Sequence, residues 1–408
     1  MSAFACDQRE STLDIEGTLL APSSPGFAEA IAQAYSRRRR PRCVCTPEGV
    51  EMYVARLGDG YIVKRMPDTG SQHAPDCVSF EAPAEISGLR NLLGSAIKED
   101  PNTGMTTLRL GFSLSKRPTR ITPASPGPPT SSASIAVTRL SLRGLLHLLW
   151  DQAELTRWHS RFEGRRSWGT VRRQLLQAAE QMLTRGEPLA SRLYVPEPFF
   201  AEHRDAIIAR RRETWSCARR SDAGRQRLLL LIGEVKEIVP ARHGHKAVIK
   251  HVPDVAFAMD DSLYHRLPQR FGPELELWSA SDSIRMLMIA TLIISDAGLP
   301  HIVELSLVTV TAQWLPVETT AEQHLVEGLV RSQRAFLKLL RYDLGSQTEL
   351  ASLALTDRGA PVPLMFARDR ERAAQGEPAP TADLSADREL HRRDSTSGQH
   401  AATPKLST

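Results

Sequence analysis

Two short clusters of metal-ligand residues near the N-terminus constrain the fold more than any other feature of this sequence. Cys43 and Cys45 are separated by one residue, and His73 and Cys77 follow after a gap of 27 residues. Zinc in structural sites takes four sulfur or nitrogen ligands in a tetrahedron, usually supplied as two such pairs. The two pairs can share one ion only if the intervening chain folds back on itself.

The segment between the two pairs has a pattern that predicts this folding back of the chain. The stretches MYVARL and YIVKRM flank Gly58-Asp59-Gly60, which predicts a β-hairpin from Val50 to Met66. Antiparallel strands bring the second pair beside the first. We therefore expect a structural zinc ion bound by Cys43, Cys45, His73 and Cys77, with no coordination position left for water. The alternative is that the cysteines are small core residues and His73 a loop residue, since C-x-C departs from the commoner C-x2-C spacing.

Composition and charge restrict the possible partners and the cellular compartment of the protein only loosely. The net charge is +5 and the pI about 9.0, with 52 basic against 47 acidic residues, so any polyanion site needs local clustering of charge. Apolar runs such as Met286 to Ile294 are too short to span a bilayer, and Met1 to Glu10 lacks a secretory pattern. We expect a cytoplasmic protein with no membrane partner.

The chain, at 408 residues, is long enough for two or three folded units in a multi-domain α+β protein. Composition predicts an N-terminal extension, a zinc-bound β-hairpin module, a flexible Pro/Ser-rich linker, a basic helical region, a C-terminal α/β domain and a disordered tail. These units are assigned to residues 1–42, 43–115, 116–135, 136–222, 223–369 and 370–408.

The helical region carries the clearest concentration of arginines. A helix pair is expected from Leu140 onward, with Ser167 capping its second member, and a further helix from Glu202 to Arg219. Trp150, Trp158 and Trp168 lie among these basic residues. One reading is a surface that contacts the phosphates of DNA; the other is that the tryptophans pack the helices and the arginines face water. The candidate contacts are Arg161, Arg165, Arg166, Arg172, Arg173, Arg210, Arg211 and Arg212.

The C-terminal part contains weaker hints of metal chemistry. Glu234-Val235-Lys236 has the E-x-K spelling of metal-dependent nucleases, which an alternating charged strand also gives by chance. The group His243, His245, His251 and Asp260-Asp261 fits no metal template, which favours a surface loop. We expect a helix from Thr320 to Leu340 followed by strands at Ala351 to Asp357 and Val362 to Ala367.

That helix–strand–strand order resembles part of the restriction-endonuclease-like fold. Active members of that fold bind metal through an acidic residue on the second strand and an E-x-K on the third. This chain has Ala351-Ser352 and Leu364-Met365-Phe366 there, leaving only Glu322 and Asp357 nearby. The resemblance therefore implies a degenerate nuclease domain without catalytic residues.

A wider resemblance covers residues 40 to 368. The stretch from RCVCTPEGVEMYVARLGDGYIVKRM to SQHAPDC, with GLLHLLWDQAELTRW and KAVIKHVPDVAFAMD, resembles the bacterial family called domain of unknown function 1173. That family has three N-terminal cysteines, matched here by Cys43, Cys45 and Cys77. The resemblance implies a setting in integrating conjugative elements and brings no known activity with it.

These observations predict a zinc-containing accessory protein of a mobile genetic element that binds nucleic acid, with DNA as a possible partner. A scaffold that binds other proteins of the element is the alternative, and an inactive metal-dependent nuclease ranks third. No Gly-rich phosphate loop or Ser-His-Asp pattern points to another enzyme class.

Overall fold

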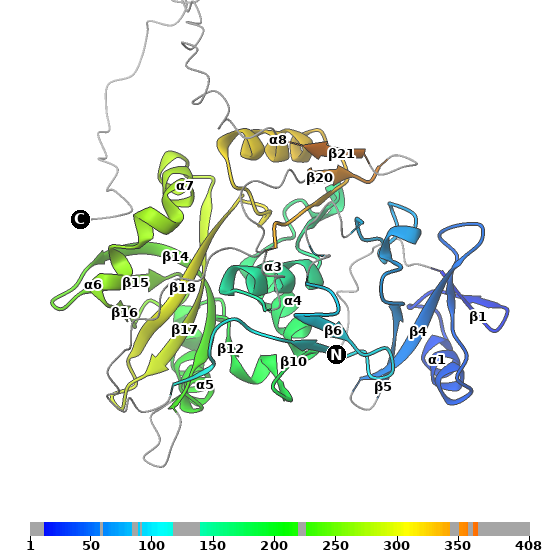
Figure 1. Ribbon diagram of the computed structural model, residues 1–408, viewed down its shortest axis with the longest axis horizontal. Helices are drawn as coiled ribbons and strands as arrows, with labels where there is room; N and C mark the ends of the chain where they lie inside the picture. The colour runs from blue at the N-terminus through cyan, green and yellow to red at the C-terminus, as the bar shows by residue number, and fades with distance from the viewer. Residues whose placement is uncertain are drawn as a thin grey trace, which may run out of the picture.

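The structure is a computed structural model that describes residues 12–57, 60–83, 89, 92–116, 139–218, 226–342, 351–357 and 362–365. Its helices and strands are interleaved along the chain, so the protein is of the mixed α+β class (Figure 1). The expected tail at 370–408 and most of the expected linker at 116–135 lie outside the described residues.

The N-terminal part is a five-stranded sheet with one helix against it. The predicted hairpin is confirmed, because its two strands pair antiparallel in register from Met52–Arg65 to Leu57–Gly60. Ile31 and Ala34 of the helix are buried in the core of this part. The sheet order is β2-β1-β3-β4-β5, and the elements are β1 (Leu13–Ile15), β2 (Thr18–Leu20), α1 (Phe27–Ser36), β3 (Arg42–Cys43), β4 (Val50–Leu57) and β5 (Gly60–Arg65).

In the middle of the chain, the described residues form three α-helices and several short strands. The predicted cap is confirmed, because the Ser167 side chain accepts a hydrogen bond from the backbone N–H of Thr170, and Ser141 caps the preceding helix in the same way. The helices are α3 (Leu142–Gln152), α4 (Trp168–Glu180) and α5 (Arg204–Ser216). The strands are β6 (Ile97–Glu99), β7 (Thr106–Leu108), β8 (Ser115–Lys116), β9 (Arg157–Trp158), β10 (Met182–Thr184), β11 (Glu187–Pro188) and β12 (Leu193–Tyr194).

Strand pairing joins residues on either side of the expected linker. β7 pairs in parallel with β10, and β8 pairs with β13 (Gln226–Arg227). The sheet β11-β10-β7-β6 is therefore built from both the expected hairpin module and the expected helical region. Whether these parts can fold separately stays a prediction.

A closed five-stranded barrel forms the largest part of the C-terminal half. The strands pair in the ring order β14-β15-β16-β18-β17, and β17 pairs back onto β14. The strand β14 is long enough to pair with two other strands of the ring. Its residues Leu229 to Val235 pair with β17, and Val235 to Pro240 pair with β15. The strands are β14 (Leu229–Pro240), β15 (His245–Ile249), β16 (Phe257–Met259), β17 (Arg285–Ile294) and β18 (Pro300–Val310).

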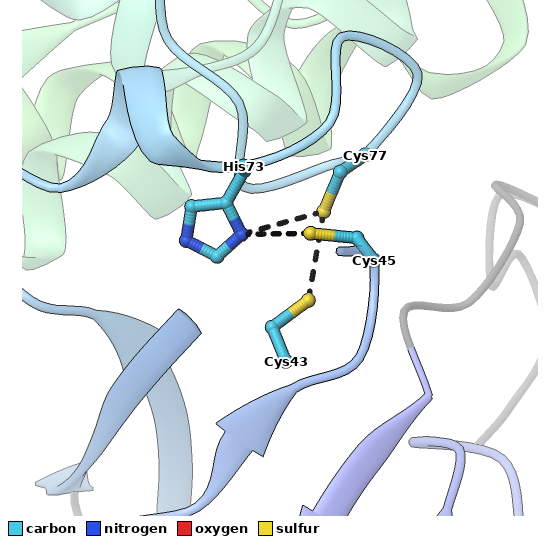
Figure 2. Close-up of side chains that lie close together, drawn as sticks. All are labelled: Cys43, Cys45, His73 and Cys77. Atoms are coloured by element: carbon cyan, nitrogen blue, oxygen red, sulfur yellow. Dashed lines mark hydrogen bonds between the residues drawn. The ribbon is translucent and has the colours of Figure 1, made fainter. Parts of the chain in front are cut away.

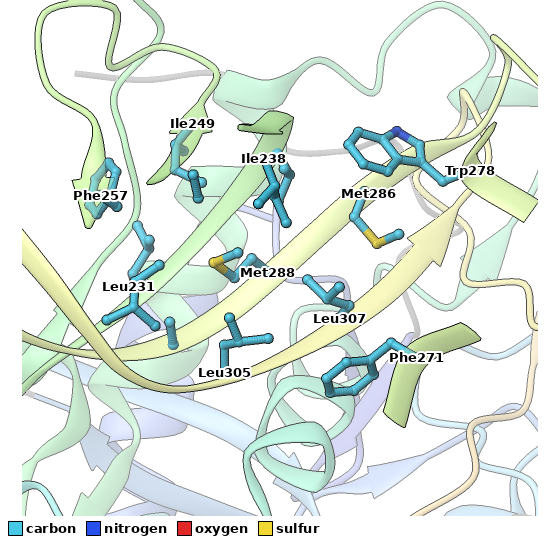
Figure 3. Close-up of a cluster of buried hydrophobic side chains, with 14 of the residues drawn as sticks. Leu231, Ile238, Ile249, Phe257, Phe271, Trp278, Met286, Met288, Leu305 and Leu307 are labelled. Atoms are coloured by element: carbon cyan, nitrogen blue, oxygen red, sulfur yellow. The ribbon is translucent and has the colours of Figure 1, made fainter. Parts of the chain in front are cut away.

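Strand alternation divides the barrel residues between two cores. Leu231, Met288 and Leu305 point into the barrel (Figure 3), where α6 (Asp261–Tyr264) and α7 (Leu267–Ala280) also contribute buried side chains. Leu230 and Leu287 point outward and pack in a second core that contains the apolar faces of α3 and α4. One side of the barrel is thus covered by the helical region.

The expected helix from Thr320 to Leu340 is wrong beyond its first part. Helix α8 (Thr320–Arg331) ends where Gln333 takes a positive φ of 54°, and the next apolar residues form β19 (Phe336–Lys338). Apolar periodicity cannot separate these two states over so short a run. The two predicted strands are present as β20 (Ala351–Leu355) and β21 (Val362–Met365), in the sheet order β21-β20-β19-β9.

Candidate metal centre

The four predicted ligands converge at one point (Figure 2). The Cys43 and Cys77 sulfurs are 3.7 Å apart, and the His73 Nδ1 lies 3.4 Å from the Cys45 sulfur and 3.7 Å from the Cys77 sulfur. All four ligand atoms lie within 4.8 Å of one another. Residues from β3, the following turn and the loop after β5 are thus brought together as the hairpin predicts.

These separations fit the edges of a zinc tetrahedron. With Zn–S about 2.3 Å and Zn–N about 2.0 Å, a regular tetrahedron has S–S edges of about 3.8 Å and S–N edges of about 3.5 Å. The observed Cys43–Cys77 and Cys45–His73 distances of 3.7 and 3.4 Å match both values. Three thiols and one imidazole form a closed set of soft ligands, so the cluster is compatible with a structural zinc ion.

Local backbone contacts fix the first pair of ligands. Cys43 ends β3, which lies between β1 and β4, and the N–H of Val44 donates to the carbonyl of Thr12 at 3.1 Å. The chain then turns at Gly49, where φ is +65°. A positive φ is readily adopted by glycine, so this turn returns the chain into β4 without strain.

A tight backbone approach fixes the second pair. A Cβ placed on Gly70 would lie 2.6 Å from the Cβ of Glu81, so only glycine fits at this position. The Gly70 carbonyl accepts hydrogen bonds from the N–H groups of His73 and Glu81. This contact closes the loop that carries His73 and Cys77.

The ligand sulfurs accept backbone hydrogen bonds, but in the absence of a metal ion their burial favours thiols over thiolates. The backbone N–H of Ala74 donates to the Cys45 sulfur and that of Ser79 to the Cys77 sulfur, both at 3.4 Å. Without an ion, the hydrogen bond to Cys77 and burial raise the pKa of the Cys43 thiol far above its usual range. A bound divalent cation would reverse this preference, because metal binding displaces the thiol protons.

His73 supports the same interpretation. Its ring is buried, its Nδ1 faces the sulfurs, and its Nε2 has no hydrogen-bond partner in the structure. Leaving Nε2 unpaired costs free energy, and coordination of a metal ion through Nδ1 would offset that cost.

The metal loop also contacts the far end of the chain, which the sequence did not predict. Arg157 donates to the backbone carbonyls of Cys77 and Phe80. Cys43, Cys77 and Phe80 are buried in one core with Leu337 of β19, with Leu339 just after it, and with Ala351 and Ala354 of β20. Contacts over such sequence separations leave no local pattern, so only the three-dimensional structure reveals them.

The eight predicted arginines fall into two groups, and four of them are held by internal contacts. Arg166 stacks over Trp158 and Phe162 and donates to backbone carbonyls, while Arg211 is buried against Asp254. Arg172 donates to the Val195 carbonyl, and Arg210 pairs with Glu197 at 2.7 Å. Arg161, Arg165, Arg173 and Arg212 are exposed.

The tryptophans of this region pack against the helices, as the second interpretation of the arginine-rich region expects. Trp150, Trp158 and Trp168 are all buried, and the indole N–H groups of Trp150 and Trp168 donate to backbone carbonyls. They are therefore not available to stack on bases.

The carboxylates considered for nuclease chemistry are in ion pairs. Glu234 is buried and pairs with Lys250 at 2.5 Å and with Arg285 at 3.4 Å. Glu322 pairs with Lys338 at 2.9 Å, and Asp357 pairs with Arg334. Among the described residues, the cluster at Cys43 is the one group of metal-ligand side chains close enough to share an ion. His245 instead contacts Asp261 at 2.9 Å.

Comparison with known proteins identifies the family and nothing more specific. No curated protein and no solved structure gives a significant match. No described helix is long and apolar enough to cross a membrane. The profile of one family, described as a protein of unknown function (DUF1173), matches residues 13–390, which is most of the chain, and the protein therefore belongs to that family.

Proposed function

We propose that this protein is a zinc-stabilised accessory protein of mobile genetic elements that binds nucleic acid. The proposal rests on a difference among the clustered arginines, some of which are exposed while others are buried or paired. Arg165, Arg173 and Arg212 are exposed and make no ion pair with a described residue, although neighbouring arginines are buried or paired. Exposed guanidinium groups are suited to the phosphate backbone, which they contact without reading sequence.

The zinc ion has a supporting part in this proposal. It would be bound by Cys43, Cys45, His73 and Cys77, and its chemistry would be structural because protein groups fill all four positions. The closed ligand set and the ion-paired carboxylates favour a binding protein over a nuclease. The setting in integrating conjugative elements rests on the family resemblance and is part of the proposal.

Replacing Arg165, Arg173 and Arg212 together by alanine is expected to weaken DNA binding about tenfold or more at low salt. Each lost phosphate contact should also reduce the slope of log affinity against log salt by about 1. Fluorescence anisotropy with labelled duplex and single-stranded DNA over a salt series measures both quantities. The loss should be similar for all sequences, because phosphate contacts do not specify sequence.

Arg210→Ala is the matched control in the same region. Glu197 already neutralises Arg210, so its loss should change affinity much less than the triple substitution. If the parent protein binds no nucleic acid at low salt, the proposal fails and a protein-binding scaffold takes its place. The same conclusion follows if the triple variant binds as well as the parent.

A further inference from the structure

One side of the barrel is left uncovered by the described helices. On β15, Ala247 and Ile249 point into the barrel core, so alternation directs Lys246 and Val248 outward. Both are half-exposed, and Ala258, which pairs with Lys246 from β16, is exposed. β15 and β16 lie at the left edge of the molecule in Figure 1, away from α3 and α4. We call this surface, with the turn at 241–244, the barrel face.

The β14–β15 hairpin of the barrel face carries an excess of positive charge, while the exposed Asp260 and Asp261 that follow β16 contact His301 and His245. Between Lys236 and Lys250 the hairpin contains four basic residues and one acidic residue, Glu237. Lys250 pairs with Glu234, whereas Lys236, Arg242 and Lys246 make no ion pair with a described residue. Such a surface is complementary to a polyanion.

The turn of the barrel face is held in one conformation. Gly244 has a positive φ of 72°, and a Cβ there would lie 2.7 Å from the carbonyl oxygen of Met259, so the turn is packed against the end of β16. The His245 ring stacks on Tyr264 with 3.5 Å between centroids and 7° between planes. Arg242 and His243 are exposed on this fixed turn. Preorganised groups lose little entropy on binding a ligand.

We infer that the barrel face binds single-stranded nucleic acid. Lys236, Arg242 and Lys246 contact the phosphates, and the exposed imidazole of His243 stacks on a base. Stacking on a side chain needs an unpaired base, because bases in a duplex already stack on their neighbours. The site is distinct from the exposed Arg165, Arg173 and Arg212 and would add a preference for single strands to their general affinity.

The connectivity of the barrel supports this ligand class. Numbered along the chain, its strands pair in the order 1-2-3-5-4-1 with helices between the third and fourth, as in OB-folds. Such barrels bind oligonucleotides or oligosaccharides on the face of strands 2 and 3, beside the loops after strands 1 and 4. The barrel face is that surface here. Fold alone does not decide the ligand, but the cationic side chains favour the polyanion.

The inference is tested with the full chain and a labelled oligothymidylate at low salt. The double variant Arg242→Glu/Lys246→Glu should bind this probe about tenfold or more weakly, because two cations are replaced by anions beside the phosphates. Its affinity for duplex DNA should fall much less. Lys98→Glu makes the same kind of change at an exposed lysine on β6, in another sheet, and should leave both affinities near those of the parent.

A second variant tests stacking without changing a lysine or arginine. His243→Ala should weaken oligothymidylate binding several-fold with little change in the salt slope, since stacking releases no counterions. Its side chain is exposed, so folding should be preserved, with an unchanged melting temperature as the check.

The outcomes separate this inference from the proposed function. Loss of binding in the Arg165/Arg173/Arg212 triple variant, with parental oligothymidylate affinity in both barrel-face variants, would overturn the inference and leave the proposed function standing. Equal loss in Lys98→Glu would also overturn it, because the effect would then be one of net charge. Loss in the barrel-face variants alone would support the inference and contradict the role given to the exposed arginines.

Discussion

Replacing Cys45 by alanine is expected to lower the free energy of unfolding by more than about 5 kcal/mol, because structural zinc sites contribute about 10–16 kcal/mol to folding in small zinc domains. Cys45 is the least buried of the three cysteines, so little of this loss would come from packing. Denaturant unfolding followed by fluorescence measures the change. A zinc chelator should destabilise the parent protein and have no further effect on the variant.

Cys217→Ala is the matched control for that substitution. Cys217 is a free, half-buried cysteine at the end of α5, outside the metal cluster. Its variant should keep parental stability within about 1 kcal/mol and keep its response to the chelator. Equal stability of the Cys45 and Cys217 variants would mean that the cluster holds no stabilising ion.

The effect of metal loss should extend beyond the N-terminal part. The sequence predicts a flexible linker at 116–135 between the hairpin module and the rest of the chain. In the structure, Cys43 and Cys77 share a core with Leu337 and Leu339 of the C-terminal segment. Hydrogen exchange in β19 and β20 should therefore accelerate in the Cys45 variant, while the barrel strands keep their protection.

Lys338→Met is expected to destabilise the protein by about 3–5 kcal/mol, because it leaves the buried carboxylate of Glu322 without its cation. Both side chains are almost fully buried, at 5% and 6% exposure. The Lys338 ammonium also donates to the carbonyls of Leu339 and Ser352 at 2.7 and 2.9 Å. This ion pair joins α8 to the β19–β20 sheet, and thermal or denaturant unfolding measures its loss.

The double variant Glu322→Gln/Lys338→Met provides the control. Removing the buried negative charge together with its partner should recover a large part of the lost stability, since an unpaired buried charge costs more than a missing pair. The amide oxygen of glutamine can still accept the hydrogen bond from the N–H of Glu318. A double variant no more stable than Lys338→Met would show that the charge of Glu322 is not the cause.

The sequence predicted those features that depend on nearby residues. The pairing of β4 with β5, the cap at Ser167 and the convergence of Cys43 with Cys77 follow from strand pattern, capping and ligand spacing over short distances. Each is determined within a few tens of residues. The structure therefore agrees with these predictions.

The remaining features depend on distant contacts. Closure of the barrel requires β17 to pair with β14, whose paired residues lie 51 to 63 positions earlier in the chain, and no local pattern specifies that partner. Arg210, Arg211 and Arg212 are indistinguishable in sequence, yet Glu197 and Asp254 leave only the third without an ion pair to a described residue. The end of α8 at Arg331 likewise reflects the pairing of Phe336 with Leu355 and Trp158, which outweighs the helical pattern of the run.

The metal content of freshly purified, reduced protein tests the account most directly. Inductively coupled plasma mass spectrometry, together with an accurate protein concentration, should give about one zinc ion per chain, since a closed set of three thiolates and one imidazole retains zinc through purification. The His73→Ala and Cys45→Ala variants should contain much less. Parent protein that contains no zinc while its thiols titrate as free and reduced would contradict the account.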